Sequence, residues 1–95
     1  MSTEVGSVRF DPGLPYRCSP QVALRPEAFG ALAYHFGTRR LSFLKSPLLA
    51  DVVRDLDQHE SVHAALDGRG VPEAERAAHV AALAQLADAG TIEPR

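Results

Sequence analysis

The sequence predicts an α+β fold, a three-stranded antiparallel meander followed by three helices, similar to a winged helix-turn-helix. Short alternating runs bounded by turn residues extend to about residue 45, and helical periodicity with helix caps follows. The 95 residues suit one small domain, because a domain of about 60 residues is already marginal. We expect an N-terminal arm over residues 1–15 and the domain over residues 16–95.

Two segments predict the first pair of strands. Val22–Arg25 is a short extended run that Pro26 closes. Phe29–Phe36 is rich in aromatic residues and leads into a hairpin turn at residues 37–38. Residues 1–15 contain scattered Gly and Pro without apolar periodicity, so we expect a mobile or draped arm.

The third strand, predicted over residues 39–44, alternates most clearly. Leu41 and Phe43 share one face, and the other face holds Arg40, Ser42 and Leu44. In a meander the outer side of this strand is an open edge with unpaired N–H and C=O groups. The edge is either protected from other strands or built to accept a peptide, and edge protection is the commoner case. Either role can be served by the flanking basic residues Arg39, Arg40 and Lys45.

Two capped helices are predicted next. Ser46 is a good N-cap and Pro47 suits the first helical position, with the apolar stripe Leu48, Leu49, Val52, Val53 and Leu56. The residues at 59–60 break this helix. Ser61 then caps a short helix that Gly68 and Gly70 end, with the stripe Val62, Ala65 and Leu66.

A third helix is predicted from Pro72 to about Ala89, with Gly90 as its stop and a terminal extended piece at residues 91–92. Its apolar face is Val80, Leu83, Ala84, Leu86 and Ala87. A DNA-reading helix exposes Arg, Lys, Asn or Gln, whereas here acidic residues outnumber basic ones. With a net charge of −2, we expect no nucleic-acid partner. A small winged-helix DNA-binding protein is the alternative hypothesis.

The sequence predicts no catalytic residues, no metal site and no cofactor. His59 and His63 are four residues apart, but Ser61 starts a new helix between them, and structural zinc sites need four Cys or His ligands. Cys18 lacks a local signature of a nucleophile. The glycines form no phosphate-binding loop. A small enzyme that uses Cys18 or a histidine pair is a third hypothesis.

The composition favours a cytoplasmic protein without a membrane partner. Cys18 is the only cysteine, so it cannot form an internal disulfide. No apolar run approaches the roughly 18 residues that span a bilayer. The first ten residues lack the basic and apolar regions of a secretory signal.

Three parts of the sequence together resemble a known family: residues 25–47, the helix start Val71–Arg76 and the ending Leu86–Gly90. They resemble the MftB family of mycofactocin biosynthesis chaperones. This family belongs with the PqqD-like recognition elements for ribosomally made, post-translationally modified peptides (RiPPs). The likeness extends from about Val8 to Ile92. It implies a sheet of three strands, then three helices, and a chaperone that binds a precursor peptide.

The resemblance also implies partners and a mode of binding. The leader of the mycofactocin precursor peptide (MftA type) adds as a strand to the edge of the third strand, against the third helix. The chaperone then delivers the peptide to a radical S-adenosylmethionine (radical SAM) maturase (MftC type), which holds the iron–sulfur clusters. The peptide-binding residues would be Arg39, Arg40, Leu41, Ser42, Phe43, Leu44, Arg76, His79, Leu83 and Leu86. An open edge also allows a homodimer.

Overall fold

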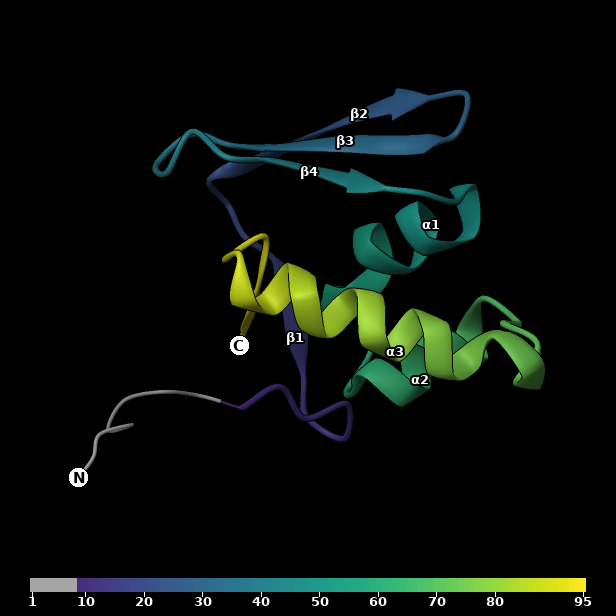
Figure 1. Cartoon of the computed structure of the whole chain (residues 1–95). Coiled ribbons are helices and arrows are strands. Elements are labelled where there is room, and N and C mark those ends of the chain that lie inside the picture. Colours follow the sequence, from purple (N-terminus) through teal and green to yellow (C-terminus); the bar gives the residue numbers. More distant parts are fainter. Residues whose placement is uncertain (1–8) are drawn as a thin grey trace.

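A three-stranded antiparallel sheet and three α-helices form most of the protein, as the sequence predicts (Figure 1). The computed structural model describes residues 9–95. The strands are β1 (Tyr16–Cys18), β2 (Val22–Glu27), β3 (Gly30–His35), β4 (Leu41–Leu44) and β5 (Ile92–Pro94). The helices are α1 (Pro47–Asp55), a 3₁₀ turn η1 (Leu56–Gln58), α2 (Val62–Gly68) and α3 (Glu73–Asp88). The helix-turn-helix arrangement itself stays a prediction.

The meander β2-β3-β4 differs from the expected strands at their ends. β2 continues through Pro26 to Glu27. The sheet tolerates this proline because Pro26 pairs with Ala31 at a position whose backbone N points away from β3. Phe29 lies in the turn between β2 and β3, not in the strand.

The turn between β3 and β4 is held by a side chain that the sequence did not single out. His35 Nδ1 accepts hydrogen bonds from the backbone N–H groups of Gly37 (3.0 Å) and Thr38 (3.1 Å). Arg39 follows with φ 62°, in the left-handed region, so the strand begins only at Leu41. The turn therefore takes two residues from the predicted third strand.

A small second sheet joins the two ends of the described chain. β1 pairs antiparallel with β5, with Cys18 opposite Ile92. Residues 91–92 were expected to be extended, but their pairing with residues 16–18 was not foreseen. Both strands have three residues, which is too short for a period-two pattern to show.

The segment before β1 lies on the start of α2. The carbonyl oxygens of Pro12 and Leu14 accept hydrogen bonds from the backbone N–H groups of His63 and Val62. The remainder of the predicted arm, residues 1–8, lies outside the described residues.

The core lies between the inner face of the sheet and α1. Ala31, Ala33 and Leu44 are fully buried on that face. The small alanine side chains let α1 approach β3 closely, and Val52 and Val53 of α1 are buried in the same cluster. Leu56, Leu66 and Leu83 extend the core among the helices.

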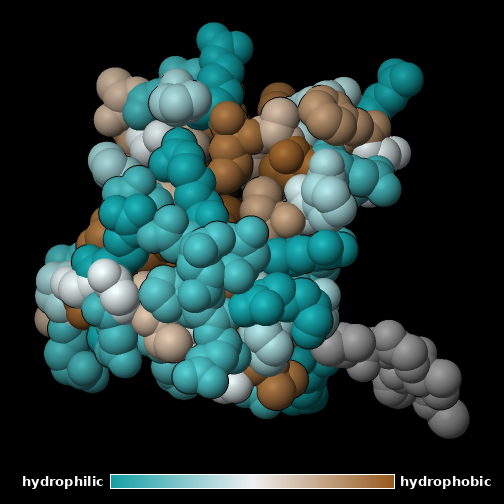
Figure 2. Space-filling view, turned by 180° about the vertical axis from the view of Figure 1, so that it is seen from behind, coloured by the Kyte–Doolittle hydropathy of each residue, from teal (hydrophilic) through white to brown (hydrophobic). Residues whose placement is uncertain are grey.

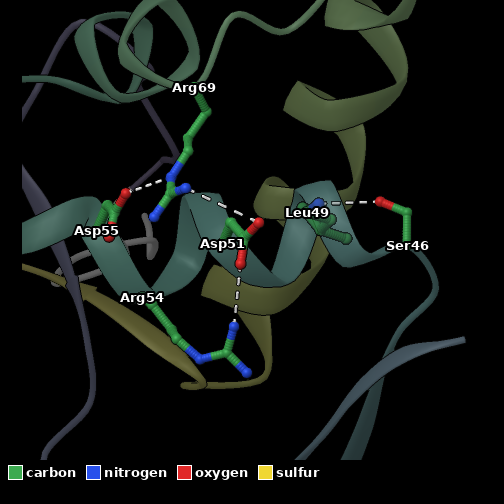
Figure 3. Close-up of polar contacts among 6 residues, drawn as sticks. All are labelled: Ser46, Leu49, Asp51, Arg54, Asp55 and Arg69. Atoms are coloured by element: carbon green, nitrogen blue, oxygen red, sulfur yellow. Dashed lines mark hydrogen bonds and ion pairs between the residues drawn. The ribbon is translucent and has the colours of Figure 1, made fainter. Parts of the chain in front are cut away.

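Polar contacts fix both ends of α1 (Figure 3). Ser46 Oγ accepts the Leu49 N–H at 2.9 Å, so the predicted N-cap is present directly after β4. Arg69, which follows α2, bonds Asp55 at 2.5 Å and lies 3.9 Å from Asp51. The hydrogen bond from Arg69 lowers the pKa of the Asp55 carboxyl below its ordinary value. The Ser46 cap thus starts α1 directly after β4, and the Arg69 contacts join α1 to the end of α2.

Candidate peptide-binding groove

The outer edge of β4 presents backbone groups that β3 does not use. The His35 N–H donates to the Arg40 carbonyl at 3.0 Å, so these two residues form a hydrogen-bonded pair of the ladder. Such pairs alternate along antiparallel strands, which makes Ser42 and Leu44 the next residues bonded to β3. The N–H and C=O groups of Leu41 and Phe43 therefore point to the open edge.

A groove runs between this edge and α3. Its larger part has a volume of about 330 Å³ and is lined by Arg40, Ser42, Phe43, Lys45, Leu49, Ala82, Gln85 and Leu86. Its smaller part, of about 200 Å³, is lined by Lys45, Ser46, Leu49, Ala78, His79 and Ala82. The two parts share wall residues, so they form one groove with β4 on one side, α3 on the other and Leu49 of α1 between them.

Two contacts keep β4 and α3 in this relation. Ser42 Oγ lies 3.3 Å from Thr91 Oγ1, just beyond the end of α3. The Thr91 N–H donates to the Leu86 carbonyl, and the Thr91 carbonyl accepts from Ser19 N–H. Thr91, which directly precedes β5, therefore links β4, the end of α3 and the residue after β1 beside the groove.

Five of the residues expected at the peptide site line the groove. Arg40, Ser42 and Phe43 contribute from β4 and the residue before it, and Leu86 contributes from α3. His79 lines the smaller part. The structure thus brings together residues that are about 40 positions apart in the sequence.

The other expected residues lie elsewhere. Leu44 and Leu83 are fully buried in the core. The Leu41 side chain is 58% exposed on the outer face of the sheet, and only its backbone faces the edge. Arg39 lies in the turn, and Arg76 bonds the carboxylate of Asp67.

Several groove residues were not singled out from the sequence. They are Lys45, Ser46, Leu49, Ala78, Ala82 and Gln85. A partial signal was present, because Ala78, Ala82 and Leu86 recur at four-residue spacing and so share one side of a helix. Alanine is common throughout this helix, however, so spacing alone could not identify its groove face.

His79 is a buried histidine with one unused nitrogen. Only 8% of the residue is exposed, and Nδ1 lies 3.0 Å from the Glu75 carbonyl oxygen, four residues earlier in α3. Nε2 has no hydrogen-bond partner among the described residues. Leaving such a group unpaired costs about 1–3 kcal/mol. His79 is therefore a groove residue that packing alone does not explain.

The two walls of the groove differ in charge. Arg40 and Lys45 supply positive charge on the β4 side. The exposed charged residues of α3 are all acidic: Glu73, Glu75 and Asp88. An acidic α3 opposes close approach to a phosphate backbone, which argues against the DNA-binding alternative.

Cys18 shows no sign of activation as a nucleophile. Burial, with smaller contributions from the carboxylates of Asp57 and Glu93, raises the pKa of its thiol. Within residues 9–95, no group of three or more His, Cys, Asp and Glu side chains is placed to hold a metal ion. In the same part of the chain, no helix is long and apolar enough to cross a bilayer.

Comparison with known proteins identifies the family. The family model of the peptide chaperone MftB family matches residues 15–93. This chain belongs to the peptide chaperone MftB family. The resemblance seen in the sequence is thereby confirmed. No solved structure matches the chain.

Three relatives carry the name peptide chaperone MftB. The one from Mycolicibacterium smegmatis is 44% identical over 95 residues, covering 99% of this chain and 93% of the relative. The one from Mycobacterium ulcerans is 47% identical over 90 residues, covering 95% and 83%. The one from Mycobacterium tuberculosis is 45% identical over 89 residues, covering 94% and 82%. The MftB family membership supports a peptide chaperone role, and its name describes no catalyst.

Proposed function

We propose that this chain binds the mycofactocin precursor peptide as an added strand on β4 and delivers it to a radical SAM maturase. The observation that carries the proposal is the open edge at Leu41 and Phe43, which borders the groove. Family membership supplies the peptide as ligand. The maturase is the MftC-type partner implied by the sequence resemblance. The chaperone itself performs no chemistry in this scheme and acts in the cytoplasm.

Strand addition explains why an edge and a groove occur together. The peptide backbone bonds the Leu41 and Phe43 edge groups, while alternate peptide side chains enter the groove. Ordering a flexible peptide costs free energy, so backbone bonds alone give weak binding. A side chain buried against Leu49 and Leu86 contributes about 1.5–3 kcal/mol.

The groove residues have different parts in this proposal. Arg40 and Lys45 attract the peptide and raise its association rate. Ala78 and Ala82 are small, which leaves room for peptide side chains. Leu44 and Leu83, expected at the site from the resemblance, support the groove from the core instead of touching the peptide.

Delivery to the maturase, in this proposal, is by tethering. The chaperone holds the leader and leaves the C-terminal part of the peptide free to enter the enzyme. Tethering the substrate in this way raises its effective concentration at the enzyme without any new contact to the reacting residues.

The experiment is a calorimetric titration of the chain with the precursor peptide and with a leader-truncated peptide. Phe43→Pro removes an edge N–H without removing a bond of the β3–β4 ladder, and Phe43→Ala is its matched control for the lost aromatic ring. We expect Phe43→Pro to weaken binding at least about tenfold more than Phe43→Ala, corresponding to about one hydrogen bond and its geometry. Equal affinities for the two variants would contradict strand addition.

Two other substitutions are poor tests of the site. Ser42→Pro removes an N–H that bonds β3, and Leu44→Asp places a charge in the core. Both damage the fold, so loss of peptide binding in either variant says nothing about the edge.

A further inference from the structure

The sheet has a second face, opposite the helices, that is rich in exposed apolar side chains. The register places Ala23, Tyr34 and Leu41 in one cross-strand row of this outer face. The next row is Arg25, Leu32 and Phe43. The alternate residues of the same strands face the core, and of these six outer-face positions Phe43 alone also lines the groove beside α3.

Aromatic rings extend this outer face at both ends. Phe29, in the turn after β2, stacks on Phe43 with ring centroids 5.9 Å apart. Phe36, in the turn after β3, meets Tyr34 edge-on at 5.5 Å. Phe36 and Phe43 are 58% and 57% exposed.

Figure 2 shows apolar side chains lying among hydrophilic ones in the upper part of the molecule, where the sheet is, while the lower, helical part is more hydrophilic. Single exposed apolar residues are normal on a protein surface, but a contiguous aromatic group marks an interaction site. The outer face meets the groove at Phe43, which belongs to both, whereas Phe29, Tyr34, Phe36 and Leu41 do not line the groove.

The charges around the outer face restrict what can cover it. Residues 20–46 carry four basic side chains and one acidic side chain, Glu27, which pairs with Arg25 at 3.0 Å, and Arg40 and Lys45 also border the groove. The rest of the chain carries six basic and eleven acidic side chains. A second copy placed face to face would bring two basic rims together, which is unfavourable. The charge instead fits a partner protein whose apolar patch is bordered by carboxylates.

Strand addition would enlarge this same face. A peptide strand on β4 presents alternate side chains to the two faces of the sheet. One set enters the groove, and the other set continues the outer face beyond Leu41 and Phe43. A partner that covers the outer face would then contact the chaperone and the peptide at once.

We propose that the outer face is the docking surface for the peptide-modifying enzyme, which meets it with an apolar patch bordered by acidic residues. The enzyme recognises a surface made jointly by the chaperone and its bound peptide, so it binds the loaded chaperone more tightly than the empty one. This inference rests on the proposed peptide chaperone function and assigns the surface that serves its second partner.

The test uses the purified cognate radical SAM enzyme as probe, with binding measured with and without saturating precursor peptide. Phe36→Glu places a carboxylate on the outer face away from the edge, and Leu14→Glu is the matched control at a residue 46% exposed in the segment before β1. Arg25→Glu reverses one rim charge, and Arg9→Glu is its control. Circular dichroism and peptide titration confirm that each variant folds and keeps its groove.

We expect wild-type chaperone to bind the enzyme more tightly when the peptide is present. Phe36→Glu should weaken enzyme binding at least about tenfold, as for a buried aromatic contact, and Arg25→Glu about threefold in a salt-dependent way. Peptide affinity should stay within about twofold for all four variants, since none alters the edge or groove.

Several results would overturn the proposal. Enzyme binding that is unchanged in Phe36→Glu and Arg25→Glu would show that the enzyme docks elsewhere. A wild-type dimer that Phe36→Glu dissociates in sedimentation would assign the face to a second copy. Co-sedimentation with phosphatidylglycerol vesicles, lost in the same variant, would assign it to a membrane. Absence of peptide binding by wild type is a separate result, because it contradicts the proposed function itself.

Discussion

The two edges of the three-stranded sheet differ in how much backbone they leave free. On the β2 edge the outward positions are Val22, Leu24 and Pro26. The Val22 N–H already donates to the Ser19 carbonyl, and Pro26 has no N–H. Leu24 is therefore the only one of these outward positions with an N–H left for a new strand.

The β4 edge has more free backbone N–H groups than the β2 edge. Leu41 and Phe43 both point N–H and C=O groups outward, at the rim of the groove. The β2 edge is thus largely closed to a new strand, whereas the β4 edge is open and borders the groove. Open edges are a liability that proteins usually protect, and the proposed strand addition is the role that an open β4 edge beside a groove would serve.

The largest expected effect comes from the contact that sets β4 on β3. Gly30 has φ 150°, and a Cβ atom there would lie 2.1 Å from the Leu44 carbonyl oxygen. Gly30→Ala must therefore displace the end of β4, at a cost of about 3 kcal/mol in unfolding free energy from strain and overpacking. Urea unfolding measures this cost.

Gly70→Ala is the control for that substitution. Gly70 also has a positive φ, of 65°, but nothing lies within 4 Å of its Cβ position. This variant should lose only about 1 kcal/mol, from the left-handed backbone. Equal losses in the two variants would mean that β4 is not held by the close approach at Gly30.

Proline substitutions on the two edges compare them directly. Leu41→Pro removes an outward N–H from β4, and Leu24→Pro removes one from β2. We expect Leu41→Pro to weaken precursor binding at least about tenfold and Leu24→Pro to leave it within about twofold. Calorimetric titration checks both, and an equal loss in the two variants would refute the distinction between the edges.

A bulky side chain in the groove should hinder peptide binding at β4 without altering the β4 backbone. Ala82→Phe puts a ring into the space that both parts of the groove share, whereas Ala77→Phe changes an exposed alanine on another side of α3. The first variant should lower peptide affinity about tenfold by excluding a peptide side chain, and the second should not. Fluorescence anisotropy with labelled precursor measures the difference.

The smallest expected effect is on stability and comes from an ion pair outside the sheet, between Asp55 and Arg69. Because Arg69 lowers the pKa of Asp55, the pair stabilises the folded protein above about pH 3.9, the usual value for Asp, and loses this effect as pH falls through the lower folded value. Asp55→Asn should slightly lower the thermal midpoint at pH 7 and change it less near pH 3. A larger change at pH 3 would contradict the assigned sign.

Local signals in the sequence were strong enough to predict the order of the elements. The alternation of Leu41 and Phe43 against Ser42 and Leu44 gave the faces of β4 correctly. The caps Ser46 and Ser61 both accept helix N–H groups as expected. Such features depend on neighbours within four residues, so a single sequence reveals them.

Features that depend on distant residues could not be predicted in the same way. β1 and β5 pair across more than 70 positions with three residues each. The groove face of α3 depends on how an alanine-rich helix is rotated against α1, and its composition fixes no rotation. The direction of each edge N–H depends on the ladder register, which only the structure supplies.

The most direct measurement is amide hydrogen exchange of the chain with and without saturating precursor peptide, read residue by residue by NMR. Strand addition predicts that the Leu41 and Phe43 amides become strongly protected on binding, while the Leu24 amide on the opposite edge keeps its rate. Protection at Leu24 without protection at Leu41 and Phe43 would contradict the account, because the peptide would then occupy the wrong edge.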